Sequence, residues 1–157
     1  MTLLSISRLV VSGLLLAPWS FGAEPRTAIR LDADWRFHRG DEEGATAAVF
    51  EDSSWQHVSV PHTWNNEGDP PQTGYYRGPG WYRRQFSAPA NWKGQRVFAR
   101  FEAASLVARV FLNGKDLGEH KGGFQAFCFE LTPHLKLGAS NVLAVRVDNT
   151  QIGRAHV

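Results

Sequence analysis

The chain has 157 residues, of which 43% are hydrophobic, 20% charged and 12% aromatic. This composition is typical of one soluble globular domain and excludes a disordered chain, a collagen or a coiled coil. The 17 Lys and Arg residues outnumber the 15 Asp and Glu residues only through Arg8 and Arg154, which lie near the two ends, so the near-neutral remainder gives no electrostatic case for a nucleic-acid partner.

Residues 1–22 have the pattern of a secretory signal peptide: a basic residue at Arg8, the apolar run 9–17, and small residues up to Gly22. The apolar run is too short to cross a bilayer, which takes about 20 residues, and no second apolar stretch follows. We therefore predict a secreted or periplasmic protein with no membrane contact after the signal peptide is cleaved. A buried N-terminal helix is the alternative interpretation of these residues.

Beyond residue 22, apolar and polar residues alternate in short runs, and this period of two predicts half-buried strands. In chain order the predicted strands are 35–38, 55–60, 81–86, 95–103, 107–113, 124–131 and 141–149. Asn113 and Gly114 predict a tight hairpin between hydrophobic runs. The stretch 44–50 is short and contains Gly44, which argues against a helix. The spacing predicts an all-β fold, a β-sandwich or jelly roll with mostly antiparallel strands.

Six motifs then carry a resemblance to a known family. They are VPHTWN at 60–65, YYRG at 75–78, GWYRR at 80–84, VFLNG at 110–114, LGEHKGGF at 117–124 and NVLAVRVDN at 141–149. In this order and spacing they resemble the N-terminal sugar-binding domain of glycoside hydrolase family 2, with a leaning toward its β-galactosidase-like members. The resemblance covers about 29–149 and implies a galactose-binding-like jelly roll that occupies 23–150.

The resemblance also implies a catalytic site that lies elsewhere. The family is a retaining one, in which two carboxylates about 5–5.5 Å apart serve as acid/base and nucleophile. The family carries them on a (β/α)₈ barrel of roughly 250 residues, more than this chain holds. We therefore expect no catalytic residue among Glu102, Glu119 and Glu130. We also expect no cofactor, and no metal site at His57 or His62, which lack a metal-binding motif.

The partners that the resemblance implies are the downstream domains of a parent enzyme and its carbohydrate substrate. Homo-oligomerisation of the parent is left open. The alternative is a stand-alone, non-catalytic carbohydrate-binding module.

The loop 61–80 is the best candidate for contact with sugar, because long loops in compact domains tend to be functional. Pyranose rings stack on aromatic side chains and hydrogen-bond to planar polar groups. The candidate residues are Trp64, Asn65, Asn66, Asp69, Tyr75, Tyr76 and Arg77. We expect this loop to reach the substrate pocket of the intact enzyme. The alternative is that 75–81 packs the sandwich and an interdomain face.

Two further expectations concern the end of the chain. Cys128, the single cysteine, lies in an alternating run and is predicted to be a buried structural thiol. Residues 151–157, QIGRAHV, resemble a translated adapter rather than the family's usual continuation, so we expect the authentic sequence to end near Thr150. A natural divergent terminus is the alternative. A domain without its final strand would leave an unpaired sheet edge and associate readily.

Overall fold

The structure is a computed structural model that describes residues 26–65 and 75–151. The chain divides into two compact units, 1–30 and 31–157. The predicted signal peptide and the residues after Gln151 lie outside the described residues. Residues 26–30 of the first unit are exposed and carry no regular secondary structure, and the sandwich belongs to the second unit.

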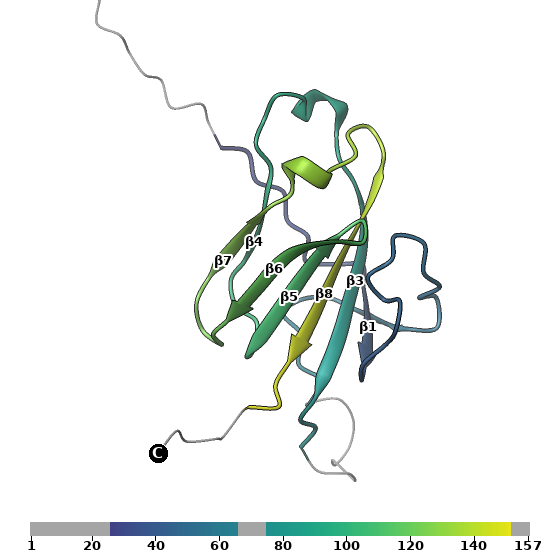
Figure 1. The fold of residues 1–157 in the computed structure, drawn as a ribbon, viewed down its shortest axis with the longest axis vertical. Helices are drawn as coiled ribbons and strands as arrows, with labels where there is room; N and C mark the ends of the chain where they lie inside the picture. Colours follow the sequence, from purple (N-terminus) through teal and green to yellow (C-terminus); the bar gives the residue numbers. More distant parts are fainter. Residues whose placement is uncertain (1–25, 66–74, 152–157) are drawn as a thin grey trace, which may run out of the picture. The chain divides into compact units, whose positions relative to one another are not determined.

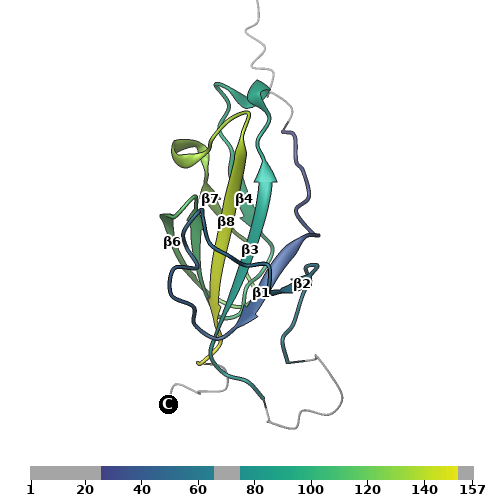
Figure 2. The same ribbon diagram turned by 90° about the vertical axis from the view of Figure 1, so that its right-hand side faces the viewer.

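Among the described residues, eight strands form two antiparallel sheets (Figures 1 and 2). The strands are β1 (Trp35–Arg39), β2 (Gln56–Val58), β3 (Pro79–Ser87), β4 (Phe98–Phe101), β5 (Val107–Leu112), β6 (Lys115–Lys121), β7 (Phe127–Glu130) and β8 (Ser140–Asp148). Two 3₁₀ turns, η1 (Ala90–Trp92) and η2 (Thr132–His134), follow β3 and β7. The larger sheet has the order β2-β1-β3-β8-β5-β6, and β4 pairs with β7 in the smaller one. The predicted all-β class and antiparallel pairing are confirmed.

The main core lies on the face of the larger sheet that packs against the smaller sheet. Its buried members are Trp35, Phe37, Val58, Trp64, Tyr82, Ala108, Val110, Leu143, Val145 and Val147. Phe101, Phe127 and Phe129 of the smaller sheet are half-buried against them. Alternate residues of β5 and β8 therefore share one face, as their period of two predicts, and their burial supplies the main driving force for folding.

The segment 40–55, between β1 and β2, covers the opposite face of the larger sheet. A second buried cluster lies there: Ala45, Trp55, Trp81, Phe111 and Ala144. Arg83 is 2% exposed on this face. Its Nε donates to Asp52 at 2.7 Å, and its Nη1 donates to the backbone carbonyls of Ala45 and Ala47. These acceptors make the burial of a charge tolerable.

The structure differs from the sequence analysis in two strands. Cys128 is exposed rather than buried, because Phe127 and Phe129 take the inward positions of β7 and the residue between them points outward. The strand β6 was not predicted. Its pairing with β5 shifts register at Leu117 and Gly118, and such a bulge interrupts the alternation by which strands are found.

Candidate functional site

The predicted sugar-facing loop is clamped at its base. Asn65 Oδ1 accepts a hydrogen bond from the backbone N of Tyr76 at 2.8 Å, and Asn65 Nδ2 donates to the Tyr76 carbonyl at 3.1 Å. This pair of bonds imitates the ladder of two paired strands and joins residues eleven positions apart. Asn66 and Asp69, two of the predicted site residues, lie outside the described residues.

Asn149, which directly follows β8, extends this clamp. It is 3% exposed. Its Oδ1 accepts from the backbone N of Gly78 at 2.7 Å, and its Nδ2 donates to the Tyr76 carbonyl at 3.2 Å. The β3–β8 register, in which Pro79 faces Asp148, brings Asn149 to this position. In the sequence, Asn149 is only the last residue of a strand motif, and no functional role was predicted for it.

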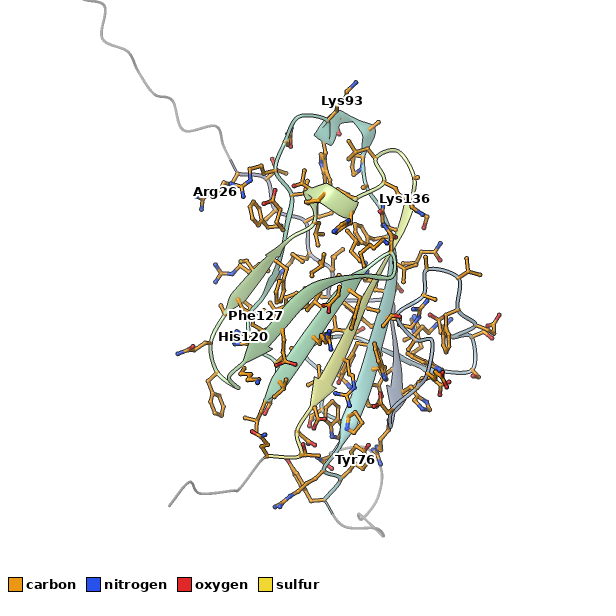
Figure 3. The ribbon with its side chains drawn as sticks, in the orientation of Figure 1. Arg26, Tyr76, Lys93, His120, Phe127 and Lys136 are labelled. Atoms are coloured by element: carbon orange, nitrogen blue, oxygen red, sulfur yellow. The ribbon has the colours of Figure 1, made fainter. Side chains whose placement is uncertain are left out.

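Tyr76 lies at the lower end of the sandwich in Figure 3 and is half-buried. Its hydroxyl donates to the Pro79 carbonyl at 2.9 Å, and the Arg39 guanidinium carbon lies 5.5 Å from its ring centroid. Burial raises the pKa of the Tyr76 hydroxyl, so it stays a donor. A Cβ at Gly78 would lie 2.5 Å from the Tyr76 hydroxyl oxygen, and this contact explains the glycine.

Trp64, another predicted site residue, packs in the core. It is 7% exposed and stacks on Phe37 with ring centroids 5.7 Å apart and planes 6° apart. Its backbone carbonyl accepts a hydrogen bond from Arg39. Trp64, Asn65 and Tyr76 therefore build the base of the loop.

Tyr75 and Arg77 are the predicted site residues that the described structure exposes to solvent. Tyr75 is 56% exposed. The guanidinium carbon of Arg77 lies 6.0 Å from the centroid of the Tyr75 ring. The pair combines an aromatic face with a planar group of five N–H donors, which is the chemistry that a pyranose ring can contact.

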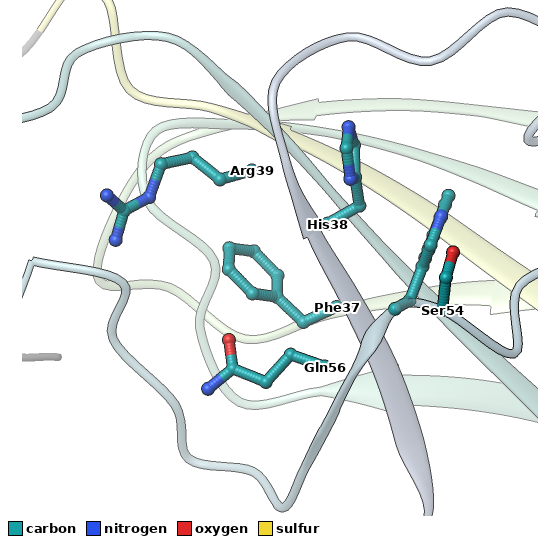
Figure 4. A pocket seen from close by; sticks show the side chains of 6 residues that line it. Phe37, His38, Arg39, Ser54 and Gln56 are labelled. Carbon is teal, nitrogen blue, oxygen red and sulfur yellow. The ribbon is translucent and has the colours of Figure 1, made fainter.

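A shallow depression lies where β1 and β2 separate (Figure 4). It is lined by Phe37, His38, Arg39, Ser54, Trp55 and Gln56. The His38 ring stacks on Trp55 with centroids 5.2 Å apart. None of the described residues that line this depression carries a carboxylate, so these residues do not supply the acid and nucleophile of glycoside hydrolysis.

Comparison with known proteins identifies the family. Residues 19–155 match the model of the glycosyl hydrolases family 2 sugar binding domain. The chain belongs to glycosyl hydrolase family 2. The resemblance carried by the six motifs is confirmed, and the sandwich described above is the sugar binding domain of this family.

Family 2 relatives of this chain carry two different activities in their names. A β-glucuronidase of Formosa agariphila is 37% identical over 136 residues, and β-galactosidase BoGH2A of Bacteroides ovatus is 40% identical over 135. These matches cover 79% and 81% of this chain but 14% and 16% of the relatives. The solved β-glucuronidase 2 of Bacteroides uniformis is 42% identical with a TM-score of 0.71, over 76% of this chain and 14% of that one. The chain thus spans a small part of the length of these relatives.

The carboxylates that the sequence analysis considered and set aside do not fit the hydrolytic chemistry of family 2. Arg100, Lys121 and Arg96 lie 3.0, 3.2 and 2.6 Å from Glu102, Glu119 and Glu130, respectively. The arginine hydrogen bonds lower the pKa of Glu102 and of Glu130. A general acid needs a raised pKa instead, so Glu102 and Glu130 do not suit that role, and all three carboxylates form ion pairs on the surface.

The two histidines considered for metal binding have other contacts. His57 lies 3.5 Å from Asp34 on the surface. His62 Nδ1 lies 2.8 Å from the Tyr82 hydroxyl, and the His62 ring packs on Phe37. Across 26–65 and 75–151, no group of three or more His, Cys, Asp or Glu side chains could hold a metal ion. Those same ranges contain no helix with the length and apolar character to cross a membrane.

Proposed function

We propose that this chain is the sugar binding domain of an exported family 2 glycoside hydrolase that removes terminal β-linked sugars, with β-galactosides as its preferred substrates. The catalytic glutamates lie on a barrel of the parent enzyme, outside this chain. The observation that carries the proposal is the family match over 19–155. The motifs VPHTWN and YYRG support the substrate, a β-galactosidase is among the relatives at 40% identity, and the signal-peptide pattern at 1–22 supports export.

In this enzyme the domain presents the loop end of the sandwich to the sugar while the barrel performs the chemistry. The hydrogen bonds of Asn65 and Asn149 around Tyr76 support this role of the domain, because they hold the base of the loop 61–80 in one geometry. Among the described residues of this loop, the exposed Tyr75 and Arg77 combine an aromatic ring and a guanidinium that can contact a substrate.

The test begins with sequencing the source DNA onward from the codon for Thr150, and continues with the gene product that it encodes. Hydrolysis of p-nitrophenyl β-D-galactoside and p-nitrophenyl β-D-glucuronide is measured for the parent enzyme and for the 157-residue chain. We expect the parent to have the higher kcat/KM on the galactoside and the chain alone to release no nitrophenol. A parent without either activity overturns the proposal, and a preference for the glucuronide overturns its substrate.

A stand-alone carbohydrate-binding module is the second candidate. The exposed aromatic–arginine pair on a hydrogen-bonded base favours it, because such a pair can bind sugar without a barrel. A reading frame that stops within a few codons of Thr150, together with sugar binding by the chain, would establish the module in place of the enzyme.

A further inference from the structure

The turn 75–78 alternates between exposed and inward residues. Tyr75 and Arg77 are exposed, whereas Tyr76 is half-buried and Gly78 is buried. The backbone N and O of Tyr76 and of Gly78, on either side of Arg77, are all hydrogen-bonded to Asn65 or Asn149. The inward side of the turn therefore fixes the direction in which the two outward side chains leave the backbone.

Asn149 is the central part of this arrangement. Burying an amide costs free energy unless its donors and acceptor are paired. At 3% exposure, Asn149 pairs both side-chain functions with one turn, and its backbone N donates to the Gly78 carbonyl at 3.3 Å. A strand end needs no buried amide for packing, so the side chain is best explained by the geometry that it imposes on Tyr76 and Gly78.

We propose that Tyr75 and Arg77 form a pyranoside-contacting pair and that Asn149 is the positioning residue that fixes their geometry. This inference rests on the proposed carbohydrate function. The Tyr75 ring stacks on the C–H face of a β-linked hexopyranoside. The Arg77 guanidinium donates hydrogen bonds to ring hydroxyls, or to the carboxylate where the sugar is a uronic acid.

Within the ranges that the structure describes, the guanidinium donors of Arg77 have no carboxylate partner. Arg83, Arg100, Arg109 and Arg146 each form an ion pair, but Arg77 forms none among the described residues. Its contact there is the Tyr75 ring. A pair held in place before ligand arrives loses little side-chain entropy on binding, so a small sugar can bind with measurable affinity.

The experiment titrates the ¹⁵N-labelled chain with methyl β-D-galactopyranoside and, separately, with methyl β-D-glucuronide, at a concentration where sedimentation shows a monomer. We expect shifts centred on 75–78. Tyr75→Ala should weaken binding about fivefold or more through loss of stacking, whereas Tyr75→Phe should retain it. The matched control is Phe124→Ala, since Phe124 is an equally available aromatic at 95% exposure in the β6–β7 loop. This control should bind like the unmodified chain.

Asn149→Ala tests the positioning role, because it leaves Tyr75 and Arg77 in place but removes the acceptor of the Gly78 N–H and one of the two amide donors to the Tyr76 carbonyl. We expect weaker binding at a temperature well below its unfolding midpoint, with partial rescue by Asn149→Asp, which keeps the acceptor for Gly78. Binding of Asn149→Ala with full affinity overturns the positioning role.

Two results would overturn the contact pair itself. One is equal weakening by Phe124→Ala and Tyr75→Ala. The other is the absence of sugar-induced shifts at 75–78 in the folded chain. Neither result bears on hydrolysis by the parent enzyme, which tests the proposed function separately.

Discussion

At the scale of single residues, two arginines fasten the segment 40–55 to the larger sheet. Arg83 reaches Asp52, 31 residues earlier in the chain, and Arg146 reaches Asp41, 105 residues earlier. Trp81 also donates to Asp41 through Nε1 at 3.0 Å. Sequence patterns show alternation over a few neighbouring residues, so they predict the strand that begins at Trp81 but give no signal for pairs this far apart.

Replacing Arg83 should be among the most destabilising changes in the domain. In Arg83→Met, Asp52 loses its partner and two carbonyl acceptors lose their donor, which we expect to cost about 3 kcal/mol. Urea unfolding at neutral pH measures the loss. Arg100→Met is the matched control, because its ion pair with Glu102 is exposed, and it should unfold almost like the unmodified chain. Equal midpoints for both variants would contradict a structural role for Arg83.

Asp41 should make stability depend on pH. Hydrogen bonds from Arg146 and then from Trp81 lower the pKa of Asp41 from 3.8 to about 2. Because the folded pKa is the lower one, the stabilisation is present above pH 3.8 and is lost as the pH falls toward 2. We expect Asp41→Asn to lower the free energy of unfolding at pH 6 by about 1 kcal/mol or less, since the side chain is 61% exposed.

At pH 2, which is close to the pKa of Asp41 in the folded chain, most of the stabilisation is lost, so the deficit of Asp41→Asn should be much smaller than at pH 6. Glu43→Gln, which removes a neighbouring carboxylate without an ion pair among the described residues, should show no pH-dependent difference. A deficit for Asp41→Asn that is the same at pH 6 and pH 2 would assign its effect to something other than charge.

The candidate site shows which part of a loop a sequence can predict. Aromatic and amide residues led the prediction to the segment 61–80, but composition cannot separate Trp64, which stacks in the core, from Tyr75, which is exposed. That separation depends on the close approach of Gly80 to Phe37 and Trp64. It also depends on Asn149, whose proximity follows from strand pairing and not from its place in the chain.

At the scale of elements, the bulge in β6 places a glycine where Phe129 of the smaller sheet approaches the larger sheet. Gly118 has φ +122°, and a Cβ there would lie 3.0 Å from Phe129 Cε1. Gly118→Ala should therefore cost about 1–3 kcal/mol through backbone strain, together with displacement of Phe129. Thermal unfolding measures the effect. Gly94→Ala is the control, since Gly94 also has a positive φ but has open space around it. A larger loss of stability for Gly94→Ala than for Gly118→Ala would exclude the contact with Phe129 as a cause.

Strands with an uninterrupted period of two were predictable and β6 was not, for a physical reason. In β5 and β8 the residues of the main core recur at every second position on the face toward the smaller sheet, while Phe111 and Ala144 are buried on the opposite face under the segment 40–55. In β6 the register shift at Leu117 and Gly118 turns the side chains out of phase. The covering segment 40–55 has no regular pattern of its own, and its contacts are made by turns.

At the scale of the whole molecule, a sheet of six strands packs against a sheet of only two strands. In the described part of the chain, β4 pairs with β7 alone, so the other edge of β4 presents backbone N–H and C=O groups without a strand partner. Phe98 on β4 is 48% exposed. An exposed strand edge with an aromatic side chain is a template for pairing with another chain. In addition, the two-stranded sheet is too narrow to bury Phe101, Phe127 and Phe129 fully, and these side chains remain half-buried.

We therefore expect the 157-residue chain to self-associate through β4. Phe98→Lys places a charge on this edge and should raise the dissociation constant of the oligomer about tenfold, an effect of roughly 1.4 kcal/mol, as measured by sedimentation velocity. Val49→Lys is the matched control: Val49 is 96% exposed in the segment 40–55 and away from this edge, so its substitution should leave association unchanged. A chain that stays monomeric at high concentration, or one that Val49→Lys disperses as well as Phe98→Lys, would show that β4 is not the associating edge.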